Sequence, residues 1–316
     1  MSIVAFCSAK GAPGVTTLSC LVGAAWPDGR RVLVAECDPS GGDLAARFSL
    51  GARPGMTSLA LALRRAGGAA GLVDRHVQRL PGGLEVLVGP PGAEAAATID
   101  GELGQVAATL ADHEADFVVD CGRLVPSATG QSELLRQARI VVLVLRPDVA
   151  AAAHGRAASA RLLGSGADAQ IPGAHVASAG VGAHLVVSGS GKADAREMAS
   201  VIGLPLLACV PADPAAAAVA CGEPGSARRF ERSALVSSAR DLASRIAAEL
   251  SSARASIQAG SRSLGEGGTG TGTGTGTGAG TSISAGGWAP RSSPGFRARS
   301  PGPVSPMPGR PLPGRP

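Results

Sequence analysis

The sequence predicts an α/β fold built on a doubly wound, mostly parallel β-sheet. Predicted strands and helices alternate throughout residues 1–256, an order typical of parallel sheets with crossover helices. The predicted strands are apolar on both faces, which is expected of strands covered by helices on both sides. With 316 residues and 45% hydrophobic content, the chain is long enough to bury a substantial core. We therefore expect one domain over residues 1–256.

Short apolar runs bounded by Gly, Pro or polar residues predict the strands, and apolar residues at helical spacing predict the helices. The predicted strands cover residues 3–7, 31–36, 83–90, 116–122, 139–147, 184–188 and 204–210. The predicted helices cover residues 16–26, 56–65, 102–113, 148–163 and 228–257. The last helix carries one apolar stripe, formed by Leu235, Leu242, Ile246 and Leu250. Because the stripe lacks bulky aromatic residues, we expect it to pack on the core rather than on a membrane.

Residues 257–316 differ in composition and are expected to form a disordered tail. Gly-Thr repeats give way to a Pro-, Arg- and Ser-rich segment with almost no aliphatic side chains to bury. The tail holds six Arg residues and one acidic residue, Glu266, so its net charge of +5 equals that of the whole chain. The domain is therefore formally neutral, which does not support DNA as its partner.

The sequence contains neither a candidate transmembrane segment nor a secretion signal. No hydrophobic run approaches the ~20 residues that span a bilayer, and the N-terminus lacks a basic segment followed by an apolar one. The abundance of Ala, Gly and Arg suggests a GC-rich bacterial genome. We expect a cytoplasmic protein, and a peripheral or polar position within the cell stays open. Six Cys residues without metal-ligand spacing are expected to be buried small hydrophobes: Cys7, Cys20, Cys37, Cys121, Cys209 and Cys221.

A damaged phosphate loop lies between the first predicted strand and the first predicted helix. The loop is Lys10-Gly11-Ala12-Pro13-Gly14-Val15-Thr16-Thr17. A strand, a Gly-rich turn and a helix N-terminus direct backbone N–H groups and the helix dipole at one point, which suits a phosphate. The ordinary loop, G-x-x-x-x-G-K-[ST], uses its Lys for the phosphates and its hydroxyl for Mg²⁺. Here Val15 replaces that Lys, while Thr16 keeps the hydroxyl. A Gly/Pro turn that only links strand and helix is the alternative.

Carboxylates follow two of the predicted strands. Glu36 and Asp38 come at the end of the strand over residues 31–36, and Asp120 comes at the end of the strand over residues 116–122. Ligands of open α/β sheets lie outside the carboxyl ends of the strands, so these residues should face the phosphate loop. An Asp after an apolar strand is the arrangement that reaches Mg²⁺, directly or through water. An Asp-Pro turn and a capping Asp are the alternatives.

Together these motifs resemble the MinD/ParA family of P-loop ATPases, of the SIMIBI class, whose deviant loop reads K-G-G-x-G-K-T-T. Lys10 matches the signature lysine of that loop, whereas Ala12 replaces its second Gly and Val15 its usual Lys. Asp38 matches the second acidic residue of the family's D-x-D-P-x-G motif, with Glu36 in place of the first. The resemblance covers the whole domain. The pilus-assembly branch (CpaE/TadZ-like) of the family tolerates degraded loops.

The resemblance implies ATP and Mg²⁺ as ligands and an ATP-dependent homodimer. It assigns two catalytic roles, with Asp38 helping to position the attacking water and Lys10 reaching the phosphates of the partner subunit. Thr16 and Asp120 would hold Mg²⁺, with Asp120 acting directly or through water.

The base-binding part of the resemblance is incomplete. Pro211 and Asp213 match the family's P-x-D segment, which borders the base. Ser188 stands where the family usually has an Asn that reads adenine, so the base-reading side chain is absent.

Two functions are consistent with these residues. The first is a MinD/ParA-like nucleotide-binding switch, a weak ATPase whose dimer organises chromosome or plasmid partitioning, septum placement, or pilus or secretion positioning with a protein partner. The alternative is a pseudo-ATPase scaffold that dimerises and binds partners without hydrolysis. Val15 indicates weak catalysis, since losing a charge-assisted hydrogen bond of ~1.5–3 kcal/mol costs roughly 10- to 150-fold in affinity or rate. DNA binding by the domain is a third possibility, which its neutral charge does not support.

Overall fold

An eight-stranded β-sheet forms the centre of the protein, in the order β3-β4-β2-β5-β1-β6-β7-β8. The computed structural model describes residues 2–27, 29–66, 71–163 and 182–265, and the predicted tail from residue 266 onward lies outside them. The paired strands are parallel except β3, which runs antiparallel to β4. The strands are β1 (Ile3–Ser8), β2 (Val32–Glu36), β3 (Gln78–Arg79), β4 (Glu85–Leu87), β5 (Asp116–Arg123), β6 (Ile140–Leu145), β7 (Gly182–Ser188) and β8 (Leu206–Val210).

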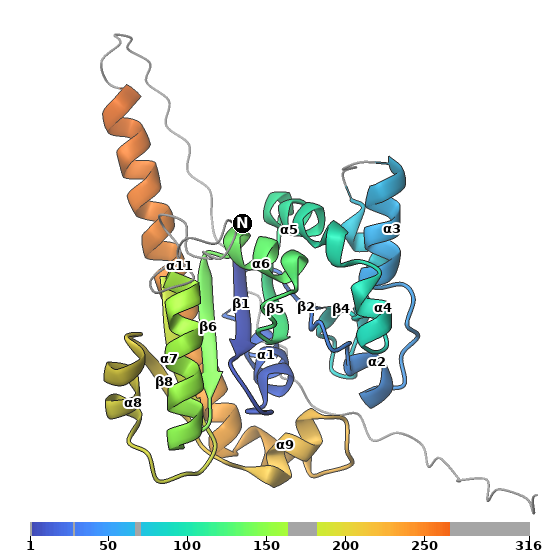
Figure 1. Cartoon of the computed structure of the whole chain (residues 1–316). Coiled ribbons are helices and arrows are strands. Elements are labelled where there is room, and N and C mark those ends of the chain that lie inside the picture. The colour runs from blue at the N-terminus through green and yellow to red at the C-terminus, as the bar shows by residue number, and fades with distance from the viewer. Residues whose placement is uncertain (1, 28, 67–70, 164–181, 266–316) are drawn as a thin grey trace, which may run out of the picture.

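Helices cover both faces of the sheet (Figure 1). On one face lie α3 (Met56–Ala66), α5 (Leu103–Asp112), α6 (Thr129–Gln137), α7 (Val149–Leu163) and α8 (Ala195–Ile202). On the other face lie α1 (Val15–Ala24), α2 (Leu44–Arg47), α9 (Pro214–Ala220), α10 (Ala227–Glu231) and α11 (Ala234–Gly265). The short elements α4 (Ala93–Ala97), η1 (Val73–His76) and η2 (Asp100–Glu102) complete the fold. The predicted doubly wound, mostly parallel architecture is confirmed.

The strand β1 shows why an uninterrupted apolar run in the sequence predicts a strand of this sheet. Ile3, Ala5 and Cys7 belong to the apolar cluster on one face, whereas Val4 and Phe6 belong to the cluster on the other. All five side chains are at most 1% exposed. A strand covered on both faces has no polar alternation, so it appears in the sequence as an uninterrupted apolar run.

The predicted helix over residues 228–257 is wrong in its extent, because it is two helices. The chain leaves the helical path at Arg232, and the Ser233 hydroxyl then accepts a hydrogen bond of 3.2 Å from the Val236 amide at the start of α11. This side-chain cap lets the backbone begin a new helix at a new angle. The helix α11 then extends to Gly265, so residues 257–265 are helical and the predicted start of the tail at residue 257 is wrong. Its predicted stripe is buried, which confirms the core-packing interpretation: Leu235, Leu242, Ile246 and Leu250.

Two of the six Cys residues are not buried, contrary to prediction. Cys209 is exposed and Cys221 is half-buried, while the other four lie in the core. Cys209 lies on β8, the last strand of the sheet, and an edge strand leaves part of its surface uncovered. Cys221 follows the last residue of α9.

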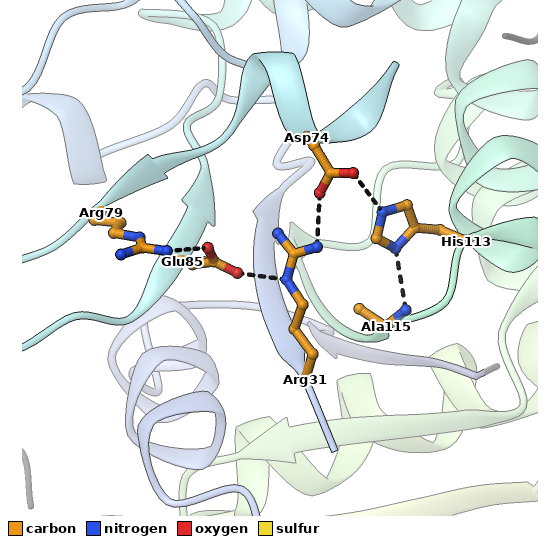
Figure 2. Close-up of polar contacts among 6 residues, drawn as sticks. All are labelled: Arg31, Asp74, Arg79, Glu85, His113 and Ala115. Atoms are coloured by element: carbon orange, nitrogen blue, oxygen red, sulfur yellow. Dashed lines mark hydrogen bonds and ion pairs between the residues drawn. The ribbon is translucent and has the colours of Figure 1, made fainter. Parts of the chain in front are cut away.

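A network of ion pairs joins β2, η1 and β4 at the amino-terminal end of β2, away from the phosphate loop (Figure 2). The Arg31 guanidinium lies 2.7 Å from both Asp74 and Glu85, and Arg79 contacts the second oxygen of Glu85 at 2.9 Å. The His113 Nδ1 accepts the Ala115 amide at 3.1 Å, so the proton of the neutral ring is on Nε2, which faces Asp74. The network ties the edge strand to its neighbours.

None of the helices in the described part of the chain combines the length and apolar composition needed to cross a bilayer.

Candidate functional site

The phosphate loop lies at the carboxyl end of the sheet, between β1 and α1. Figure 1 shows the arrowheads of β1 and β6 pointing toward this end, where α9 also lies. Gly11 and Gly14 have φ of 75° and 90°, values that side chains other than Gly rarely adopt. The first backbone bond of α1 runs from the Leu18 amide to the Gly14 carbonyl at 2.8 Å. The amides of residues 15–17 therefore have no acceptor within the helix, and together they suit an anion.

Val15 occupies the position of the usual loop lysine and is buried. Its side chain is 6% exposed and belongs to the same apolar cluster as Leu18 and Phe6. The side chain therefore contributes to the core on the α1 face and supplies no charge to the loop. A bound phosphate would depend on the backbone amides at this point.

Thr16 and Asp120 come together below the loop, as the sequence predicts for a Mg²⁺ site. The Asp120 carboxylate is 1% exposed and accepts a hydrogen bond of 2.9 Å from the Gly122 amide, with the Thr16 hydroxyl beside it. Burial, together with the charges of Glu36 and Asp38, raises the pKa of Asp120 to about 7.

This pair fits a Mg²⁺ ion held partly by a substrate. Mg²⁺ in nucleotide sites takes one or two protein oxygens and completes its shell with phosphate and water. Thr16 and Asp120 supply a hydroxyl and a carboxylate that lie side by side. No group of three or more His, Cys, Asp or Glu side chains within the described ranges is arranged to hold a metal by itself. A Mg²⁺ ion here would therefore need the nucleotide.

Asp38 lies directly beside the Asp120 strand. Its Oδ1 accepts the Ser40 amide at 2.7 Å, which closes a tight turn after β2. The carboxylate rests on the α-carbon of Gly122, because a Cβ added at Gly122 would lie 1.8 Å from the Asp38 Oδ2. Burial raises the pKa of Asp38. The two acidic motifs thus form one acidic edge, since the neighbouring strands also pair Glu36 with Asp120.

Glu36 has a role that the family motif did not reveal. Its carboxylate is 1% exposed and accepts three backbone amides: Asp43 at 2.8 Å, Leu44 at 3.0 Å and Gly89 at 2.9 Å. Burial raises the pKa of Glu36 although all three amides favour its charged form. The residue ties the Asp38 loop to the end of β4. Closely approaching glycines at Gly42 and Gly89 leave room for it, and they were the only signal of this contact in the sequence.

A pocket of about 270 Å³ lies on the other side of the loop. Pro13, Gly14 and Thr17 line it from the loop, and Pro211 and Asp213, which were predicted to border a base, line it from the segment after β8. The rest of the lining comes from the loop, α1, α9, α11 and the neighbouring strand ends, as follows: Ala12, Leu18, Arg146, Ser188, Gly189, Val210, Ala212, Pro214, Ala217 and Leu235.

Two side chains in this pocket already have structural roles. The Ser188 hydroxyl donates to the Pro13 carbonyl at 3.0 Å and so fixes the phosphate loop against β7. The Asp213 carboxylate accepts the Ala216 amide at 3.0 Å and caps α9. Arg146, which sequence analysis did not single out, brings a positive charge to the pocket.

The predicted signature lysine, Lys10, is not bonded to the other predicted site residues of its own chain. Lys10 is exposed and forms no hydrogen bond or ion pair with any residue that the structure describes. Thr17 also differs from a phosphate ligand, because its hydroxyl lies 3.4 Å from the Cys221 Sγ. Of the predicted site residues, the structure therefore brings together the loop backbone, Thr16, Asp38 and Asp120, but leaves Lys10 outside.

The raised pKa of Asp120 predicts an unusual pH dependence of stability without Mg²⁺. Between about pH 4 and pH 7 the folded protein keeps a proton that the unfolded chain has released, so this group makes stability fall as pH rises. Asp120→Asn cannot ionise, so it should not lose stability as pH rises through this range. At pH 8 the variant should be more stable than wild type by roughly 2–4 kcal/mol. Urea unfolding in EDTA at pH 5 and pH 8 measures the difference. An unchanged pH dependence in the variant would contradict the assignment to Asp120.

Solved structures of ParA and MinD proteins share this fold at low sequence identity. A ParA family ATPase from Chlorobium tepidum TLS is 18% identical, with a TM-score of 0.60 over 77% of this chain and 97% of its own. The septum site-determining protein MinD of Pyrococcus horikoshii OT3, complexed with Mg-ADP, is 16% identical, with a TM-score of 0.59 over 78% and 95%. The MinC:MinD cell division protein complex of Aquifex aeolicus gives 14% identity and a TM-score of 0.55 over 78% and 96%. No model of a known protein family and no curated protein matches the sequence.

Proposed function

We propose that this chain, which has the MinD/ParA-like P-loop ATPase fold, is a nucleotide-binding switch protein with weak ATPase activity. The observation that carries the proposal is the position of the Thr16 hydroxyl beside the buried carboxylate of Asp120, at the phosphate loop. A hydroxyl and a carboxylate in this position suit the Mg²⁺ ion of a bound nucleotide. The MinD structure with Mg-ADP supports the same ligand class.

Each part of the site has a role in this proposal. The free amides of residues 15–17 bind the phosphates, and the pocket lined by Pro211 and Asp213 takes the base. A bound Mg²⁺ would neutralise charge on the phosphates, with Thr16 and Asp120 as its protein ligands. Asp38, held by the Ser40 amide beside Gly122, positions the attacking water. Hydrolysis is slow because Val15 supplies no charge to the transferred phosphate.

A nucleotide-dependent homodimer completes the switch. Lys10 is exposed next to the loop, so its ammonium is free to reach the nucleotide of a partner subunit across a two-fold interface. The dimer would act with a protein partner in chromosome or plasmid partitioning, septum placement, or pilus or secretion positioning. The MinC:MinD complex supports a protein partner for this fold. The protein is proposed to act in the cytoplasm or at its membrane periphery.

A pseudo-ATPase scaffold is the second candidate, and two observations favour it. Val15 is buried in the core, and the Ser188 hydroxyl is used by the Pro13 carbonyl rather than by a base. In this case the protein dimerises and binds partners without hydrolysing ATP.

Titration calorimetry with ATP, ADP and GTP, each with and without Mg²⁺, distinguishes the two candidates. The switch requires weak binding of ATP that Mg²⁺ strengthens, accompanied by slow phosphate release. If none of the three nucleotides binds at millimolar concentration, the scaffold replaces the switch. Hydrolysis as fast as that of an intact P-loop ATPase would refute the role given to Val15.

Val15→Lys should strengthen ATP·Mg²⁺ binding roughly 10- to 150-fold, because it restores a charge-assisted hydrogen bond to the phosphates. The lysine stem would replace the buried valine while its ammonium reaches the loop. Val15→Met is the matched control, since it has similar length without the charge. Calorimetry on the three proteins measures the effect, and an equal gain from Met and Lys would show that packing, not charge, limits binding.

A further inference from the structure

A second concave surface lies next to the base pocket, between α9 and α10. It is a groove of about 710 Å³. Its lining residues share a short stretch of the chain and are Asp213, Ala215, Ala216, Ala218, Val219, Pro224, Gly225, Ser226, Arg228, Arg229, Phe230, Arg232 and Ser233. Neither the phosphate loop nor the acidic edge contributes to it, and Asp213 is the only lining residue that it shares with the base pocket.

Three arginines give this groove a positive rim. Arg228, Arg229 and Arg232 are all exposed, and none of their side chains has an ion pair or hydrogen bond with a residue in the described part of the chain. Some other arginines of the domain are paired, for example Arg47 with Asp43. Like charges this close repel one another unless an anion lies between them, so the rim favours a negatively charged occupant.

The floor of the groove is apolar. Ala215, Ala218, Val219 and Pro224 line it, and Phe230 lies beneath at 3% exposure. The only acidic side chain in the lining, Asp213, already accepts the Ala216 amide that it caps. An occupant must therefore offer apolar side chains to the floor and carboxylates to the rim.

We propose that this groove binds an acidic, partly apolar peptide segment of a partner protein. The chain's own tail is unsuited because it carries six Arg residues and one Glu. Duplex DNA presents phosphates but little apolar surface, so it would leave the floor uncovered. An amphipathic segment with carboxylates at helical spacing satisfies both parts of the groove at once.

The groove and the base pocket share α9. Asp213, which caps α9, lines both cavities, and the neighbouring helix residues Ala216 and Ala217 line the groove and the base pocket respectively. A peptide in the groove would therefore contact the same helix that borders a base. The docking surface goes beyond the proposed nucleotide switch and does not require it, so its test uses the nucleotide-free full chain.

The probe is a display library of random twelve-residue peptides, selected against the immobilised full chain. Enriched peptides should carry an excess of Glu and Asp together with Leu-type side chains. Their affinity, measured by fluorescence anisotropy, should fall roughly tenfold or more in the triple variant Arg228→Gln, Arg229→Gln, Arg232→Gln. The control removes the same charge from exposed arginines elsewhere, at Arg75, Arg156 and Arg196, and should leave the affinity unchanged.

Three results would overturn the proposal. Enriched peptides without an excess of Glu and Asp would show that the groove does not select acidic segments. An equal loss of affinity in the control variant would show that the net charge of the protein, not the three groove arginines, sets the affinity. A twenty-base-pair DNA duplex that binds more tightly than the selected peptides, and loses its binding in the triple variant, would make the surface a nucleic-acid site. None of these results depends on ATP binding.

Discussion

Glu36→Ala is expected to lower the free energy of unfolding by about 3–5 kcal/mol. The wild-type carboxylate, 1% exposed, is the acceptor for the amides of Asp43, Leu44 and Gly89. Alanine leaves three N–H groups without this acceptor, two of them buried (those of Leu44 and Gly89), and a cavity where Gly42 and Gly89 approach the side chain. Urea unfolding of wild type and variant measures the loss.

Two further variants separate the hydrogen bonds from other effects of the change. Glu36→Gln keeps one carbonyl oxygen as an acceptor, so its loss should be intermediate. Glu114→Ala removes an exposed carboxylate and should stay within about 0.5 kcal/mol of wild type. A Glu36→Ala protein that unfolds at the wild-type urea concentration would mean that water replaces the carboxylate, and that Glu36 does not anchor the Asp38 loop.

Lys10→Ala should abolish ATP-dependent dimerisation while leaving the monomer as stable as wild type. Lys10 is exposed and has no hydrogen bond or ion pair with the described residues, so its loss should cost the monomer little stability. In a two-fold symmetric dimer the substitution counts twice, because each of the two nucleotide sites loses the Lys10 ammonium of the other subunit. Lys10→Arg should rescue poorly, since a planar guanidinium does not replace a compact ammonium among closely packed phosphates.

Light scattering with and without saturating ATP·Mg²⁺ measures this prediction. Lys192→Ala is the matched control, because Lys192 is exposed and is the only other lysine in the sequence. It should dimerise as wild type does. A wild type that stays monomeric with ATP, or a Lys10→Ala protein that dimerises normally, would remove the switch mechanism and leave the scaffold in its place.

The sequence by itself determined the architecture and the order of the site motifs. Buried parallel strands such as β1 and β6 contain only residues that suit an apolar environment on both faces, so each run predicts its strand without knowledge of its neighbours. The phosphate loop, Asp38 and Asp120 follow strand ends, and parallel strands bring their carboxyl ends to one edge. Their convergence was therefore predictable from strand order alone.

Only the tertiary structure decided which side chains at the site form hydrogen bonds that hold the fold together. Glu36 contacts Gly89, and Ser188 contacts Pro13, across long stretches of sequence, so no local pattern predicts either hydrogen bond. The groove lined by Arg228, Arg229 and Arg232 also depends on tertiary structure. It forms between α9 and α10, and α10 is a helix separate from α11 because the chain turns at Ser233. Propensity and periodicity act within a few residues, whereas these contacts depend on where packing places whole elements, and that information is not local.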